Sequence, residues 1–142
     1  MGDGRNYRES GGFDQYHYHQ VGDTITSSNG VQGKIIEKKD SSKEYHDGLP
    51  MYANTSEVYF KISDKTKKIE QARIYANRKV ALDFDWGHSH KEFEEGVVHV
   101  HVWYKNKNDD WVRSKHPRMM NNFEMKRYGE LLKLADSDVK LR

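Results

Sequence analysis

Histidines and aspartates crowd into one short segment of the chain. Four of the eight histidines and two aspartates fall within residues 83–101, in the runs DFDWGHSH and HVH. Alternation along a β-strand places Asp83 and Asp85 on one face of their strand, and His99 and His101 on one face of theirs. A sheet face that carries carboxylates and imidazoles outside the apolar core is a natural floor for a solvent-reachable cleft. These side chains are the candidate site.

Two kinds of chemistry fit this cluster. The first is metal binding, in which His88, His99, His101 and Asp85 offer nitrogen and oxygen ligands to one divalent transition metal such as zinc. The second is metal-independent phosphoryl transfer. There one imidazole takes the proton of a ribose 2′-hydroxyl, a second acid protonates the leaving oxygen, and Arg73 or a nearby lysine stabilises the developing charge. Imidazole titrates near neutral pH, which suits it to both proton transfers. The plain alternative is a hydrogen-bonded polar sheet face without chemistry.

Aromatic and basic residues near the cluster are candidates for contacts with nucleic acid. Trp103 and Tyr75 have the flat rings on which bases stack, although core packing is the commoner fate of such residues. Lys115 and Arg118 lie in the run KHPRMM, a basic loop before the last helix, where a phosphate could dock. A solvated turn is the alternative for this loop.

The composition excludes several classes of protein. The 142 residues suit one domain, with 32% charged and 35% hydrophobic residues and a mean hydropathy of −1.07. No apolar run reaches the roughly 18–20 residues of a membrane span, so no membrane partner is expected. The N-terminal residues lack the apolar stretch of a secretory signal, so none is expected in this chain. The absence of cysteine excludes disulfide scaffolds, thiolate metal sites and cysteine nucleophiles.

Charge alternates in blocks along the chain. Residues 1–60 carry a net charge of −3, residues 61–80 of +5, residues 81–104 of −4 and residues 105–142 of +4. The histidine cluster lies in the second acidic block, between two basic blocks. Such flanking blocks could meet a polyanion, and a solvated surface of mixed sign is the alternative.

The pattern of residues predicts strands that position the cluster. Residues 1–20 are rich in glycine and polar residues and are expected to be a flexible tail or linker, followed by a single domain over 21–142. A hairpin over 24–39 turns at Asn29–Gly30. Residues 40–56 are expected to be a loop, and residues 57–63 alternate as a strand.

The strands that carry the cluster follow. Strands over 69–76 and 80–86 are joined by a three-residue loop, 77–79, which sets Ile74 opposite Leu82 and Arg73 opposite Asp83. One face then carries Ala72, Ile74, Val80, Leu82, Phe84 and Trp86.

The chain is expected to end in two more strands and a helix. The strands cover 97–104 and 111–113. The helix over 122–135 is capped by Asn121 with Glu124 three residues on. Its apolar stripe contains Phe123, Tyr128, Leu131, Leu132 and Leu134. The expected fold is α+β: a twisted antiparallel sheet of about four to six strands with one C-terminal helix packed on its apolar face.

Three successive segments resemble a known group of domains. GLPMYANTSEVYFKI, EQARIYANRKVALDFDWGHSH and GVVHVHVWY resemble small C-terminal domains of bacterial polymorphic toxins and prophage-associated proteins. The shared outline, over residues 48–104, is a strand pair ending in IY…DxDxxH, a polar loop and HxHxW. Many such domains are assigned to the barnase/EndoU/colicin/RelE group of nucleases. The resemblance implies an α+β sheet and metal-independent cleavage of RNA without a cofactor.

The residues and the resemblance together lead to one main hypothesis. His99 and His101 act as general base and acid, while His88 and His90 contact the substrate or share that role. Arg73 neutralises phosphate charge, and Asp83 or Asp85 orients an imidazole.

The same hypothesis names partners and a location. RNA is the expected partner, with an immunity protein as a second partner. The expected location is the cytoplasm of the producing cell or of a target cell. Two alternatives stay open: a non-catalytic phage or mobile-element protein, with or without a His/Asp metal site, and a metal-dependent hydrolase.

Overall fold

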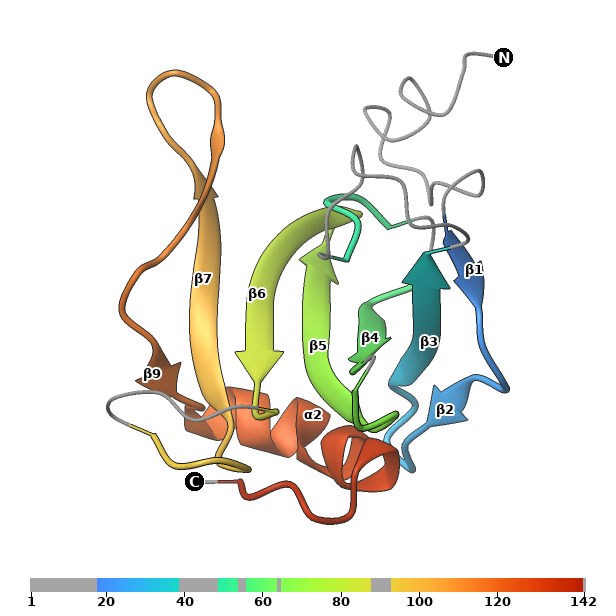
Figure 1. Ribbon diagram of the computed structural model, residues 1–142. Helices are drawn as coiled ribbons and strands as arrows, with labels where there is room; N and C mark the ends of the chain where they lie inside the picture. The colour runs from blue at the N-terminus through green and yellow to red at the C-terminus, as the bar shows by residue number, and fades with distance from the viewer. Residues whose placement is uncertain (1–17, 39–48, 54–55, 64, 88–92, 142) are drawn as a thin grey trace.

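The chain folds into one large sheet and a C-terminal helix. The computed structural model describes residues 18–38, 49–53, 56–63, 65–87 and 93–141. Within these residues the order along the sheet is β1-β3-β4-β5-β6-β7-β8, with β2 beside β3 and β9 beside β7 (Figure 1). The elements are β1 (Tyr18–Gln20), β2 (Ile25–Thr26), β3 (Gln32–Lys38), β4 (Val58–Ile62), β5 (Ile69–Ala76), β6 (Lys79–Asp85), β7 (His99–Lys105), β8 (Trp111–Arg113), β9 (Arg118–Met119) and α2 (Asn122–Ala135).

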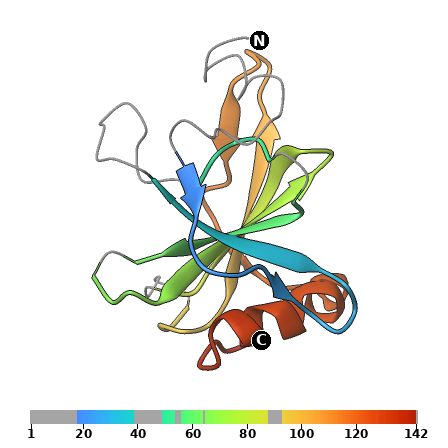
Figure 2. The ribbon, with the colours of Figure 1, turned by 90° about the vertical axis from the view of Figure 1, so that its right-hand side faces the viewer.

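The predicted α+β class is confirmed, with differences in detail. Nine strands are present in the described residues, more than the four to six expected, and β3 pairs with β4 in parallel. The strands cross one another at a marked angle in Figure 2, as in an open twisted sheet. Residues 18–20 were expected in a tail, but they form β1 because Tyr18 is buried and β1 pairs with β3. Among the described residues, no helix has both the length and the apolar character needed to span a membrane.

The β5–β6 hairpin has the predicted register but not the predicted loop. Ile74 pairs with Leu82 and Arg73 with Asp83, as expected. The turn, however, contains only Asn77 and Arg78, both with positive φ (51° and 67°), which is the conformation of the tight hairpin turn. A register shift between Ile74 and Tyr75 restores the pairing. The prediction for Val80 is therefore wrong, since the shift pairs it with Tyr75 and packs it on the opposite side from Ile74.

Two apolar clusters fill the two sides of the sheet. The larger cluster lies between the sheet and α2, and it includes Phe60, Phe84, Val100, Leu131 and Leu132, all less than 1% exposed. The smaller cluster packs on the other side, where the segment 49–53 covers the sheet. It contains Tyr18, Ile36, Leu49, Ala53, Tyr59, Tyr75 and Val80. The candidate site lies on this second side.

Helix α2 begins as predicted but buries a different stripe. The Asn121 side chain accepts from the backbone N–H of Glu124, and the Glu124 carboxylate accepts from the backbone N–H of Asn121. Tyr128, Leu131 and Leu132 are buried as expected. Phe123 and Leu134 are not, with exposed fractions of 68% and 55%. At about 100° per residue, these two side chains point away from the face that carries Tyr128, so their inclusion in the stripe was wrong.

Gly33 in β3 is a position where only glycine fits. A Cβ atom there would overlap the ring of Phe60, which is fully buried in the larger cluster. We expect Gly33→Ala to lower the free energy of unfolding by about 1–3 kcal/mol, measured by urea denaturation. Gly129→Ala is the control, because its Cβ would meet only the end of the Leu141 side chain at 3.3 Å and alanine favours helix by about 1 kcal/mol. Equal losses for both variants would contradict the packing argument.

The ion pair between Glu57 and Arg127 links α2 to the sheet, and its strength depends on pH. Arg127 donates two hydrogen bonds to Glu57 at 2.7 and 2.6 Å, and the Tyr128 hydroxyl donates a third. The hydrogen bonds from Arg127 lower the pKa of Glu57 below the usual 4.5, against the opposing effect of burial. A lowered folded-state pKa means that the stabilisation is present above the unfolded pKa and disappears as the pH falls through the folded one.

We therefore expect Arg127→Met to reduce stability at pH 7 and to matter less in acid. Both side chains are partly exposed, 42% for Arg127 and 30% for Glu57, so the loss at pH 7 should be about 1 kcal/mol or less. Urea denaturation of wild type and variant at pH 7 and pH 3 measures both values. A difference between the two proteins that grows on acidification would refute the pairing.

Candidate metal centre

Pairing between β6 and β7 brings the predicted carboxylates and imidazoles together. Asp83 lies opposite His101 and Asp85 lies opposite His99. Directly paired residues on one face have Cβ atoms about 4.5–5.5 Å apart, so the four side chains form one cluster. All four are buried, with exposed fractions of 6% or less. The expectation of a solvent-reachable cleft floor was therefore wrong: the cluster lies inside the protein.

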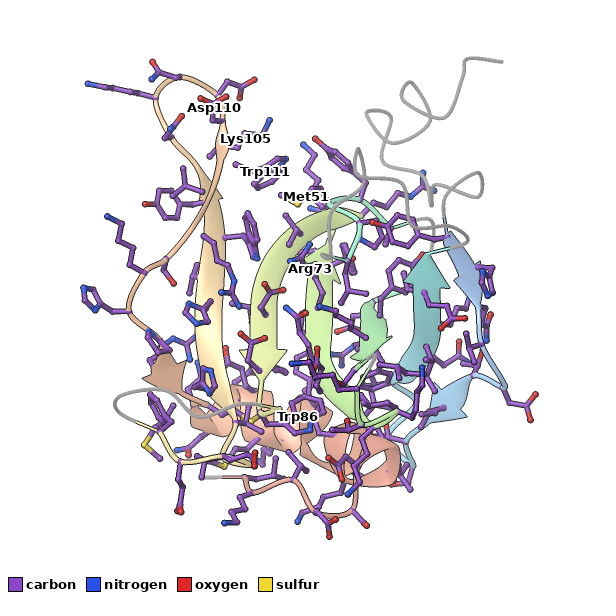
Figure 3. The ribbon with its side chains drawn as sticks, in the orientation of Figure 1. Met51, Arg73, Trp86, Lys105, Asp110 and Trp111 are labelled. Carbon is purple, nitrogen blue, oxygen red and sulfur yellow. The ribbon has the colours of Figure 1, made fainter. Side chains whose placement is uncertain are left out.

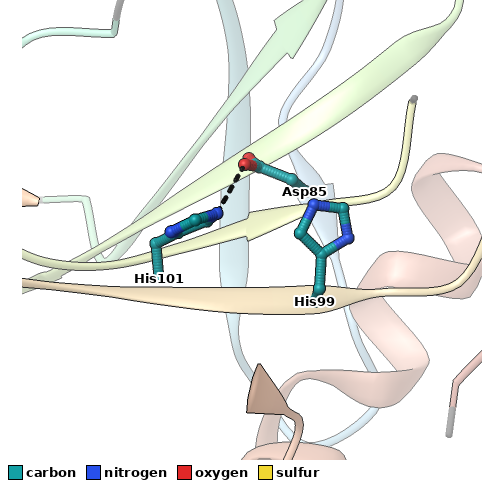
Figure 4. Close-up of side chains that lie close together, drawn as sticks. All are labelled: Asp85, His99 and His101. Carbon is teal, nitrogen blue, oxygen red and sulfur yellow. Dashed lines mark ion pairs between the residues drawn. The ribbon is translucent and has the colours of Figure 1, made fainter. Parts of the chain in front are cut away.

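Three of these residues could hold a metal ion. Asp85, His99 and His101 each present one ligand atom, and these atoms lie within 4.8 Å of one another. Figure 4 shows the three side chains converging, with Oδ2 of Asp85 3.9 Å from Nε2 of His101. Ligand atoms around a tetrahedral zinc ion lie roughly 3.3 Å apart, as its bond lengths of about 2.0–2.2 Å require. The ligand atoms would therefore have to approach one another by roughly 1.5 Å or less to bind one zinc ion.

Backbone carbonyls orient both imidazoles. Nδ1 of His101 lies 2.7 Å from the Ser114 carbonyl oxygen, and Nδ1 of His99 lies 3.3 Å from that of Val97. A carbonyl oxygen only accepts, so each Nδ1 carries a proton, and in the neutral ring the lone pair is then on Nε2. This arrangement, in which the second ring nitrogen is held by a carbonyl, is typical of metal-bound histidines. The ring of Phe93 stacks on His99 with a centroid distance of 5.4 Å.

Asp83 is the centre of a buried charge network. Arg73 donates to both of its carboxylate oxygens, at 2.7 and 3.0 Å, and the Trp103 indole donates at 2.8 Å. Arg113 adds a bond of 2.9 Å. Burial acts to raise the pKa of Asp83, but the charge of Arg73 and these hydrogen bonds hold the pKa below its ordinary value. Asp83 is therefore a structural anion rather than a proton carrier.

Arg73 serves Asp83 rather than a substrate. Its side chain is 5% exposed and donates a further hydrogen bond of 2.6 Å to the Leu49 carbonyl oxygen. Its guanidinium lies 4.9 Å from the centroid of the Trp103 ring. Figure 3 shows Arg73 over the sheet below Met51, with Trp86 at the opposite end near α2. With these contacts, Arg73 cannot reach a phosphate group in this conformation, contrary to the role expected from the sequence.

Arg113 is the cation that the sequence reasoning missed. It donates to Asp83 and also to Oδ2 of Asp85, and its side chain is 34% exposed. Residues 111–113 were expected to form a short strand, and β8 confirms it. The strand pairing contains the signal that would have identified Arg113. Trp103 pairs with Arg113, and directly paired residues share a face. This signal was missed because the register across the β7–β8 turn was not predicted.

Comparison with known proteins assigns this chain to no family. No protein-family model matches this chain, and no curated protein or solved structure is detectably similar to it. The interpretation of the site therefore depends on its own geometry. Two imidazole nitrogens and one carboxylate oxygen form a ligand set suited to zinc and other divalent transition metals.

The remaining candidate residues are dispersed. Tyr75 is buried, its hydroxyl donates to the Pro50 carbonyl oxygen, and burial raises its pKa. It offers no surface for a stacked base. Arg118 makes two hydrogen bonds to Glu124, at 2.9 and 2.8 Å, so it reinforces the start of α2. Lys115 is exposed. His88 and His90 lie outside the described residues.

Proposed function

We propose that this domain binds one divalent transition-metal ion through Asp85, His99 and His101. The main support is that their ligand atoms lie within 4.8 Å of one another in a buried site. Each ligand comes from β6 or β7, so the ion joins the two strands at the centre of the charge network. The primary effect of such an ion is to stabilise the fold.

The state of Asp85 supports this assignment. Its Oδ1 atom is buried and accepts no hydrogen bond within the described residues. A buried carboxylate oxygen without a partner costs free energy, and a bound cation removes that cost. The carbonyl contacts of the two histidines support it as well, because they leave both Nε2 atoms as lone-pair donors.

Thermal melting with and without metal tests the proposal. The purified domain is first stripped with excess chelator, the chelator is removed by dialysis, and Zn²⁺ is then added. We expect zinc at about 100 times its Kd to stabilise the fold by about 2.7 kcal/mol, which raises Tm by about 5–10 °C in a domain of this size. Magnesium, a poor ion for imidazole ligands, is the control. Identical melting curves with and without zinc would refute the proposal.

Cleavage of RNA is the second candidate function. It is supported by the two imidazoles of His99 and His101, whose ring centroids lie 5.8 Å apart, beside a carboxylate. For this function they would act as general base and acid, with Arg113 rather than Arg73 beside the phosphate. Because both rings are buried, the cluster would have to open before RNA could reach them. The test is incubation of the domain with RNA in excess chelator. Cleavage that disappears in His99→Ala would favour this function, and intact RNA at every pH would eliminate it.

A further inference from the structure

Arg113 binds Oδ2 of Asp85, one of the two oxygens of the carboxylate in the proposed metal site, and the inference that follows rests on that proposed function. Its guanidinium bridges Oδ2 of Asp83, at 2.9 Å, and Oδ2 of Asp85. His101 approaches the same Asp85 oxygen at 3.9 Å. An ion held by Asp85 and His101 would therefore arrive beside a cation that is already bound.

The charge balance of the cluster disfavours the presence of both cations. Asp83 and Asp85 carry two negative charges, and Arg73 and Arg113 carry two positive charges. The cluster is thus neutral before any metal binds. A divalent ion would leave a buried excess of two positive charges, which a low-dielectric interior penalises strongly. Removal of one guanidinium halves that excess.

Only one of the two guanidiniums can leave easily. Arg73 is 5% exposed and is held by Asp83, the Leu49 carbonyl and the face of Trp103. Arg113 is 34% exposed and belongs to the three-residue strand β8 at the end of the sheet order. Rotation of its long side chain would place the guanidinium in water, where the charge is solvated.

The backbone beside Arg113 can remain in place while the side chain moves. The next residue, Ser114, accepts from Nδ1 of His101 through its carbonyl at 2.7 Å. Its hydroxyl accepts from the backbone N–H of Val102 at 2.9 Å. These contacts fix the strand position and keep His101 oriented, so the exchange involves the Arg113 side chain alone.

We propose that Arg113 is the internal counter-ion of the metal site, which holds Asp85 in the metal-free protein and moves toward solvent when the ion binds. Arg113 is a positioning residue: it touches the ligand carboxylate and sets the concentration of metal at which the site fills. It also keeps the carboxylate pair of Asp83 and Asp85 neutralised when no metal is present.

Nuclear magnetic resonance of the arginine side chains tests the displacement in the wild-type protein. The Nε–H signal of Arg113 is assigned by its absence in Arg113→Lys. On titration with Zn²⁺ we expect that signal to move toward the position of a solvated arginine. The Nε–H signal of Arg73, which is bonded to Asp83 at 2.7 Å, should shift much less. Zinc binding with an unchanged Arg113 signal would overturn the inference.

A charge-removing variant tests the energetic consequence. Arg113→Met keeps much of the side-chain length and removes the competing charge, so we expect zinc to bind about tenfold more tightly or better. Arg118→Met is the matched control, since Arg118 also pairs with a carboxylate but at Glu124, away from the site. Its zinc affinity should equal that of wild type.

The outcomes separate the two proposals. If wild type binds zinc and Arg113→Met binds with equal or lower affinity, the counter-ion inference fails and the metal site stands. If neither protein binds zinc, the proposed function fails and the inference fails with it. If Arg113→Met does not fold, the titration of the wild-type arginine signals decides alone.

Discussion

Replacement of Asp83 by alanine is expected to lower the free energy of unfolding by about 3–5 kcal/mol. Asp83 is fully buried and accepts hydrogen bonds from Arg73, Trp103 and Arg113. Its removal leaves the guanidinium of Arg73 without a counter-ion. The Arg73 side chain is 5% exposed and cannot reach water unless the covering segment 49–53 unfolds. A loss of this size is a large part of the total stability of a typical domain. Equilibrium urea denaturation at pH 7 measures it.

Two further variants separate charge from general damage. Asp138→Ala removes an exposed carboxylate that pairs with Lys68 at 3.5 Å, and we expect a change below about 0.5 kcal/mol. The double variant Arg73→Met with Asp83→Leu removes both buried charges together. It should be more stable than Asp83→Ala alone, because no uncompensated ion remains. An Asp83→Ala protein within about 1 kcal/mol of wild type would contradict the network.

Removal of one proposed ligand is expected to abolish tight zinc binding. In metalloproteins, loss of a residue that merely supports a ligand already costs about 10–100-fold in affinity. Loss of a ligand itself should therefore cost on the order of 100-fold or more. Asp85→Asn and His101→Gln remove the charge or the ring nitrogen while they retain polar side chains of similar reach. Isothermal titration with Zn²⁺, below the melting temperature of each variant, gives the affinities.

The control for this series is an exposed histidine outside the site. His116 lies in the loop between β8 and β9 and is exposed, so His116→Ala should bind zinc as wild type does. If Asp85→Asn retains wild-type affinity, the carboxylate is not a ligand. If His116→Ala loses binding to the same extent as His101→Gln, zinc binds to surface histidines rather than to the buried cluster.

Strand alternation was sufficient to predict the shared faces of the site residues, although it failed for Val80, beyond the register shift in the β5–β6 hairpin. Asp83 with Asp85, His99 with His101, and Arg73 opposite Asp83 all follow from a period of two and a pairing of apolar residues. The helix and its capping box were equally predictable, since Asn121 and Glu124 form a local signature. These features depend on residues close together in the sequence or on one dominant apolar pattern.

Burial of the site was not predictable in the same way. The carbonyl oxygen that accepts from Arg73 belongs to Leu49, 24 residues away in a segment without periodicity. That segment, 49–53, was correctly expected to lack regular strand structure, but no local pattern indicates where a loop will pack. The same limit hid Arg113, whose role depends on the register across the turn after β7. Long-range packing of irregular segments is decided by the tertiary fold and leaves little trace in composition.

The stripe of α2 shows that hydrophobic residues alone do not define the buried face of a helix. Phe123 and Leu134 are as hydrophobic as Leu131, so composition alone includes them. Their angular positions lie near one another and far from that of Tyr128, and the structure leaves both exposed. The buried face is instead completed by Glu124, which is 4% exposed and paired with Arg118. A buried carboxylate on the helix was not expected from an apolar periodicity.

Titration of the metal-free protein with Co²⁺, followed by visible absorption, tests the proposed metal site most directly. Cobalt takes the place of zinc in nitrogen and oxygen sites, and its absorption bands report the ligands around it. We expect saturation at one ion per chain, with bands that disappear in Asp85→Asn and persist in His116→Ala. Absence of saturable binding, or a one-to-one complex that survives Asp85→Asn unchanged, would rule out a metal site at Asp85, His99 and His101.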